Sequence, residues 1–85
     1  MATTGASRSL AATVGDNIRR CRLAAGFTQH DLAVKLGSSD AMAVSRWERG
    51  VHRPNEENLV ALAELLGRDV AWFYSESSPG TERAA

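Results

Sequence analysis

Residues 28–53 read TQHDLAVKLGSSDAMAVSRWERGVHR, and this stretch decides the fold. Its apolar residues recur at helical spacing and predict two short helices, one over residues 29–36 and one over residues 41–49. Thr28 can cap the first helix, because its hydroxyl can accept a hydrogen bond from a backbone N–H of the first turn. Gly37 can end that helix, because glycine adopts positive φ without steric cost. The stretch therefore predicts a helix, a tight turn and a second helix.

Three further helices are predicted around this pair. One precedes it over residues 14–25, one follows it over residues 56–66, and a short one covers residues 70–74. The core residues expected from these three helices are Val14, Ile18, Cys21, Leu59, Leu62, Ala63, Leu66, Val70 and Phe73. No alternating pattern typical of a β-strand extends over more than a few residues. The sequence therefore predicts an all-α fold, a compact five-helix bundle.

The two ends of the chain differ in composition from its middle. Residues 1–12 are mostly Ala, Thr, Ser and Gly and predict a flexible N-terminal arm, while residues 75–85, SESSPGTERAA, predict a disordered tail. A single domain over residues 13–74 remains. No apolar run approaches the roughly 20 residues that span a bilayer, and the N-terminus lacks the apolar region of a secretory signal. With one cysteine and hence no internal disulfide, the chain is predicted to be cytoplasmic, with no membrane partner.

The charge of the chain is balanced overall but unevenly distributed. The net charge is zero, which on its own argues against a nucleic-acid partner. Residues 19–53, however, hold seven basic and three acidic side chains, a net charge of +4, whereas residues 54–82 hold one basic and six acidic side chains, a net charge of −5. This asymmetry suggests one basic and one acidic face. Charges that merely cover a solvated surface are the alternative.

No pattern in the sequence indicates catalysis or a metal site. His30 and His52 are the only histidines, and no cluster of ligands accompanies either. There is no nucleophile with a base, no pair of carboxylates in a pocket-like context and no glycine loop for phosphate. Cys21 is expected to be a small buried hydrophobe. We therefore predict that the chain is not an enzyme and has no cofactor.

Several segments, taken in order, resemble a known family. They are IRRCR (18–22), GFTQHDLAVKLG (26–37), VSRWERG (44–50), LVALAELLG (59–67) and DVAWFY (69–74). Together they resemble the Cro/cI-type (XRE-family) helix-turn-helix domains of phage repressors and bacterial regulators, over about residues 14–74. The resemblance implies a lambda-repressor-like bundle that inserts its third helix, about 41–49, into the major groove of double-stranded DNA as a homodimer. It implies a nucleoid-associated transcriptional regulator, with repression as the simplest outcome.

The resemblance also implies roles for individual side chains. Those expected to face base edges are Ala41, Met42, Ser45 and Arg46. Those expected to contact the DNA backbone are Thr28, Gln29, Arg49, His52 and Arg53. Arg22 and Glu48 match a pair that often forms a partly buried salt bridge between the first helix and the end of the third. Trp72 and Tyr74 are candidates for the dimer interface, with packing of Trp72 against the first helix or the tail as the alternative.

Two departures from the family pattern affect the reading surface. Residues 38–40 (Ser-Ser-Asp) fill the interval before the third helix, where relatives usually have a hydrophobe and then Ser or Thr, so the turn is one residue longer and more polar. Ala41 and Met42 cannot make bidentate hydrogen bonds; they can pack on thymine methyl groups, or only within the protein. Arg46 is then the best candidate for a specific contact, since its planar fork fits the two acceptors of guanine, with a phosphate contact as the alternative.

A protein-binding module, such as an antitoxin or an adaptor, is the alternative function for this fold. The uncharged total and the apolar Ala41 and Met42 favour it slightly. The acidic helix over residues 56–66, or the tail, can serve as a contact for a protein partner. A DNA-binding domain is distinguished from such a module by binding to duplex DNA that weakens steeply as salt rises.

Overall fold

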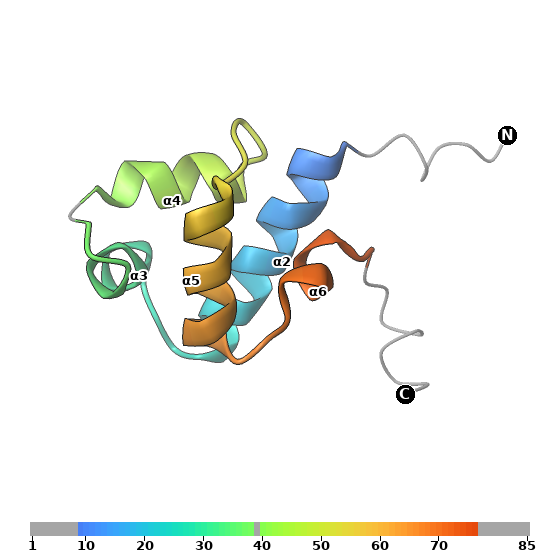
Figure 1. Ribbon diagram of the computed structural model, residues 1–85. Helices are drawn as coiled ribbons and strands as arrows, with labels where there is room; N and C mark the ends of the chain where they lie inside the picture. The colour runs from blue at the N-terminus through green and yellow to red at the C-terminus, as the bar shows by residue number, and fades with distance from the viewer. Residues whose placement is uncertain (1–8, 39, 77–85) are drawn as a thin grey trace, which may run out of the picture.

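The computed structural model describes residues 9–38 and 40–76, and these residues form five helices and no strand (Figure 1). In chain order the helices are α2 (Leu10–Ala24), α3 (Gln29–Lys35), α4 (Ala41–Glu48), α5 (Glu56–Leu66) and α6 (Val70–Tyr74). The all-α prediction is confirmed. Of the predicted arm and tail, residues 1–8 and 77–85 lie outside the described residues. No helix in the described part is long and apolar enough to cross a membrane.

Helix α2 begins four residues before the predicted start at Val14. The side chain of Ser9 accepts a hydrogen bond from the backbone N–H of Ala12 at 3.0 Å, which caps the helix at Leu10. Residues 10–12, whose composition predicted part of the flexible arm, are therefore helical. The apolar stripe did not reveal this first turn, because Leu10 is 47% exposed and adds nothing to the core.

The other helix ends follow their local signals closely. The C-caps of α2, α3 and α4 are Ala25, Leu36 and Arg49, so each of these helices ends one residue before its predicted end. The bounds of α5 and α6 agree with the prediction. Asn55 caps α5 through its side chain, and Gly67 ends it in the left-handed conformation with φ of 70°.

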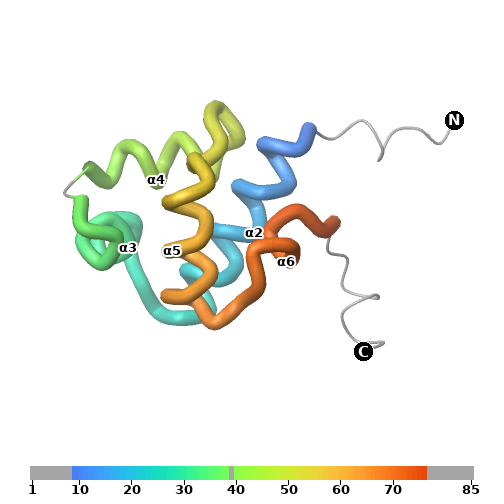
Figure 2. Tube along the Cα trace, viewed as in Figure 1, coloured from blue at the N-terminus to red at the C-terminus, as the bar shows by residue number. Residues whose placement is uncertain are grey.

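One hydrophobic core joins the five helices. Its buried apolar members are Val14, Ile18, Cys21, Leu32, Ala33, Val44, Trp47, Leu59, Leu62, Ala63 and Phe73. Helix α4 packs on both α2 and α3, and α6 packs on α2. Helices α3 and α6 lie on opposite sides of α5 in Figure 2. The predicted core residues Leu66 and Val70 are only partly buried and pack at its edge.

Helix α2 approaches the C-terminal end of α4 so closely that the contact requires glycine. A Cβ added to Gly15 would lie 2.1 Å from the carbonyl oxygen of Trp47 and 3.0 Å from that of Glu48. One added to Gly50 would lie 3.2 Å from the Cα atom of Ala12. We call these contacts the glycine clasp. In the glycine clasp the backbones of the two helices are in direct contact, and this contact fixes the C-terminal end of α4 on the first half of α2.

A buried amide attaches α6 to α2. Asn17 is 2% exposed and lies next to the apolar stripe of α2. Its Nδ2 donates to the backbone carbonyl oxygens of Phe73 and Ser75, both at 2.9 Å. Because α6 has only five residues and no side-chain cap at its start, these hydrogen bonds and the buried Phe73 ring help to hold it in place.

Candidate nucleic-acid interface

The start of α3 is held by a reciprocal pair of hydrogen bonds. The backbone N–H of Asp31 donates to Thr28 Oγ1, and the backbone N–H of Thr28 donates to Asp31 Oδ2, both at 2.9 Å. Hydrogen bonds to the Asp31 carboxylate, first from the Thr28 backbone N–H and then from the Thr28 side chain, hold the pKa of this carboxyl below its usual range. The Thr28 hydroxyl oxygen therefore accepts a hydrogen bond within the first turn of α3.

The turn between α3 and α4 is polar and caps the second helix. Gly37 has φ of 83°, which ends the first helix. The side chain of Asp40 then accepts from the backbone N–H of Met42 at 3.0 Å, and Ser38 Oγ accepts from the backbone N–H of Asp40 at 3.0 Å. Residue 39 lies outside the described residues. The polar side chains that replace the family's hydrophobe therefore stabilise the start of α4.

Helix α4 turns one side to the core and the other outward. Val44 and Trp47 are buried. The four residues expected to face base edges, at positions 41, 42, 45 and 46, share the opposite side because of their spacing. Met42 is 55% exposed, so it does not pack only within the protein, while Ala41, Ser45 and Arg46 are half-buried.

Arginine side chains lie around the C-terminal end of α4. Arg49 Nε donates to Ser45 Oγ at 3.2 Å, which extends its side chain back along the helix. No described residue forms a hydrogen bond or ion pair with the guanidinium of Arg46. His52 and Arg53 are exposed in the loop that follows, and the buried Pro54 ties this loop to the bundle. The expected backbone-contacting residues 49, 52 and 53 thus lie together in one segment.

A buried carboxylate connects the start of α3 and the end of α4 to α2. Arg22 donates from Nε to Glu48 Oε2 at 2.5 Å and from Nη2 to Glu48 Oε1 at 3.0 Å, and from Nη1 to the Phe27 carbonyl oxygen at 2.8 Å. The Arg22 and Glu48 side chains are 9% and 3% exposed. The hydrogen bonds to Glu48 raise the pKa of Arg22, against the effect of burial. Gln29 Nε2 also donates to Glu48 Oε1 at 3.0 Å.

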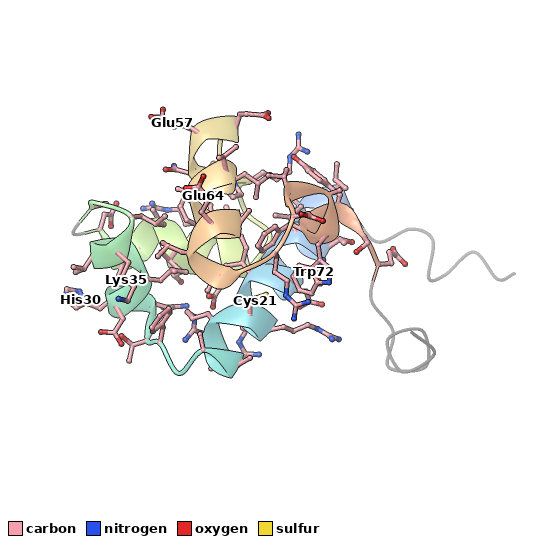
Figure 3. The ribbon with its side chains drawn as sticks, turned by 60° about the horizontal axis from the view of Figure 1, so that its bottom comes forward. Cys21, His30, Lys35, Glu57, Glu64 and Trp72 are labelled. Atoms are coloured by element: carbon pink, nitrogen blue, oxygen red, sulfur yellow. The ribbon has the colours of Figure 1, made fainter. Side chains whose placement is uncertain are left out.

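The aromatic residues of α6 lie away from this surface. Trp72 is half-buried: its ring contacts Phe73 edge-on at 5.2 Å between centroids, and the Arg68 guanidinium lies 4.4 Å above it. Figure 3 shows Trp72 near Cys21, apart from His30 and Lys35 on α3. Burial raises the pKa of the Cys21 thiol. Trp72 therefore packs largely within its own chain, and Tyr74, at 38% exposed, offers the more open surface.

Three structural roles were not predicted from the sequence: those of Gly15, of Asn17, and of Gln29 as a partner of Glu48. A glycine inside a helical pattern signals a close approach, and an asparagine beside an apolar stripe signals a buried polar contact. The link from Gln29 had no local signal, because its partner lies 19 residues away. The described residues contain no group of three or more side chains suited to a metal ion.

The sequence and the fold both have known relatives. A model of the helix-turn-helix family HTH_3 matches residues 18–73. The chain is 40% identical over 61 residues to the HTH-type transcriptional regulator DicA of Escherichia coli (strain K12), which covers 72% of this chain and 44% of that protein. It therefore spans less than half the length of that relative. The fold is similar to the P22 c2 repressor protein, crystallised in complex with synthetic operator 9T in the presence of Tl+, with a TM-score of 0.69 and 33% identity over 75% of this chain and 96% of that one.

Proposed function

The chain belongs to this helix-turn-helix family, and we propose that it is a sequence-specific regulator of transcription that binds double-stranded DNA and acts as a repressor. The observation that carries this proposal is the outward side of α4, where Arg46 and Met42 project from a helix that is fixed to the core on its other side. The similarity to a repressor crystallised with its operator supports it.

Binding divides between two sets of side chains. The exposed Arg49, His52 and Arg53, with Thr28 and the amide of Gln29, contact phosphates and supply orientation and much of the affinity. On α4, Arg46 donates two hydrogen bonds to O6 and N7 of a guanine. Met42 and Ala41 pack on thymine methyl groups, because apolar side chains recognise the C5-methyl in the major groove.

The repressor acts as a homodimer, because one domain of this size covers few base pairs. A two-fold arrangement places two copies of α4 on half-sites about 34 Å apart. The outer side of α6 is the proposed interface, with Tyr74 at its centre and Trp72 beside it. Analytical ultracentrifugation of Tyr74→Ala tests it, and this variant is preferred because Trp72→Ala also removes packing on Phe73. Self-association equal to that of wild type would remove α6 from the interface.

Selection from random duplex DNA with the purified protein tests the function directly. The expected result is a palindromic consensus with half-sites about one helical turn apart, bound less tightly as salt rises. Placed over a promoter, this consensus should lower transcription in the presence of the protein. Absence of any enriched sequence would reject the proposal and favour a protein-binding module such as an antitoxin or adaptor.

A further inference from the structure

Glu48 has an unfavourable position that three side-chain hydrogen bonds offset. It is the last residue of α4, where the negative end of the helix dipole disfavours a carboxylate. Its side chain is 3% exposed, so water cannot compensate. Arg22 donates to both carboxylate oxygens, and Gln29 Nε2 donates to Oε1 at 3.0 Å. Each of the two donors comes from a different helix.

The carboxylate fixes the orientation of the Gln29 amide. An ionised carboxylate only accepts hydrogen bonds, so the amide nitrogen must face Glu48 and the amide cannot rotate to present its oxygen there. No buried side-chain nitrogen or oxygen lacks a partner in the described residues. The amide oxygen of Gln29, which makes no hydrogen bond to them, is therefore open to solvent. One N–H is engaged, and the second is held in a set direction.

We propose that Glu48 is a positioning residue for DNA binding, which holds the Gln29 amide so that its second N–H donates to a DNA phosphate. This inference rests on the proposed function. Phosphate oxygens only accept hydrogen bonds, so a freely rotating amide would present its oxygen part of the time and lose the contact. Glu48 belongs to α4 and Gln29 to α3. The carboxylate therefore also fixes the position of the phosphate-contacting amide relative to the recognition helix.

The test uses the duplex obtained by selection, with a single methylphosphonate in place of each phosphate in turn. Removing the charge and acceptor that Gln29 contacts should weaken wild-type binding about tenfold, as expected for a hydrogen bond to a charged group. Gln29→Ala should lose this sensitivity at that one phosphate and so identify it. Glu48→Gln should lose it at the same phosphate, while the phosphates contacted by Arg49 and Arg53 keep theirs. Glu64→Gln, an exposed change on α5, is the matched control and should keep the wild-type profile.

Two results would overturn the inference. In the first, Glu48→Gln keeps the wild-type sensitivity at the Gln29 phosphate, or no phosphate distinguishes Gln29→Ala from wild type. In the second, Glu48→Gln loses sensitivity evenly at all phosphates, which is the signature of a general displacement of α4. If Glu48→Gln does not fold, the double variant Arg22→Met/Glu48→Leu replaces it, because an apolar pair is often tolerated where a buried ion pair stood, and it should show the same local loss.

The experiment distinguishes failure of this inference from failure of the proposed function. If wild type binds no selected duplex, the proposed function fails and the positioning role fails with it. If wild type binds with a phosphate profile that Glu48→Gln leaves unchanged, only the positioning role fails. The free protein supplies a further readout: Gln29→Glu should lower the melting temperature more than Gln29→Ala, because a second carboxylate would face Glu48. Equal effects would contradict the link.

Discussion

Gly15→Ala is the sharpest test of how α4 is held, because two physical effects predict opposite signs. In a helix interior, alanine is favoured over glycine by about 0.5–1 kcal/mol, so local propensity predicts a more stable protein. The added Cβ, however, would lie 2.1 Å from the Trp47 carbonyl oxygen and 3.0 Å from that of Glu48. Both are backbone atoms that cannot rotate away, so α2 and α4 must separate by about 1 Å.

The expected net effect is destabilisation. Overpacking costs about 1–3 kcal/mol, and more where backbone must move, which leaves about 1–2 kcal/mol after the gain in propensity. For a domain of this size, that corresponds to a melting temperature lower by about 5–15 °C. Thermal unfolding followed by circular dichroism measures it. Affinity for the selected duplex, measured well below the melting temperature, should also fall, because α4 is displaced.

Gly67→Ala is the matched control for Gly15→Ala. Its Cβ meets no atom within 4 Å, and its positive φ of 70° makes alanine unfavourable by about 1–2 kcal/mol. It should therefore lower stability to a similar extent without changing the DNA affinity. A melting temperature of Gly15→Ala at or above that of wild type would refute the glycine clasp.

Three other substitutions test separate parts of the molecule. Arg46→Ala should weaken specific binding by about 1–3 kcal/mol and relax the preference at one base pair; an unchanged consensus after selection with the variant would refute base recognition. Asn17→Ala should lower the free energy of unfolding by about 2–3 kcal/mol, because the carbonyl groups of Phe73 in α6 and of Ser75 just after it lose their donor; amide hydrogen exchange should rise first in α6, and unchanged protection there would argue against the attachment. Because the folded-state pKa of Asp31 is lowered by Thr28, its contribution to stability is present above its unfolded pKa of about 3.9 and is lost as the pH falls through the lower folded value. Asp31→Asn should therefore flatten the acid side of the stability curve, and melts that keep the wild-type slope would contradict this.

The helices that the sequence predicted well have their signals within a few residues. Thr28 and Gly37 bracket α3, and Asn55 and Gly67 bracket α5, so caps and periodicity together place these ends. The start of α2 failed because its cap, Ser9, stands in an Ala- and Ser-rich segment that reads as unstructured, and the first turn adds no core residue. A capping residue therefore predicts the start of a helix only where the composition of the neighbouring residues differs from that of an unstructured segment.

The candidate site also combines features that the local sequence predicts with features that it does not. The outward side of α4 follows from the spacing of Val44 and Trp47, which sequence alone supplies. The hydrogen bond from Gln29 to Glu48 depends instead on how α3 crosses α4, and that angle is a property of the packed core. The attachment of α6 by Asn17 joins residues 56 positions apart. No periodicity within one helix encodes such distances.

The glycine clasp has a consequence for how this domain can change its target. Ala12, Gly15 and Gly50 hold α4 by its C-terminal end, whereas Ala41 and Met42 lie at the opposite end, where the side chain of Asp40 caps the helix. Substitutions at positions 41 and 42 therefore leave the backbone contacts of the glycine clasp in place. Under the proposed function, a new preference for DNA sequence would accumulate at these two positions, while selection for a folded protein acts on others. Under the proposed function, the residues that hold the helix would then differ from those that recognise DNA, so sequence preference would be free to diverge without loss of stability.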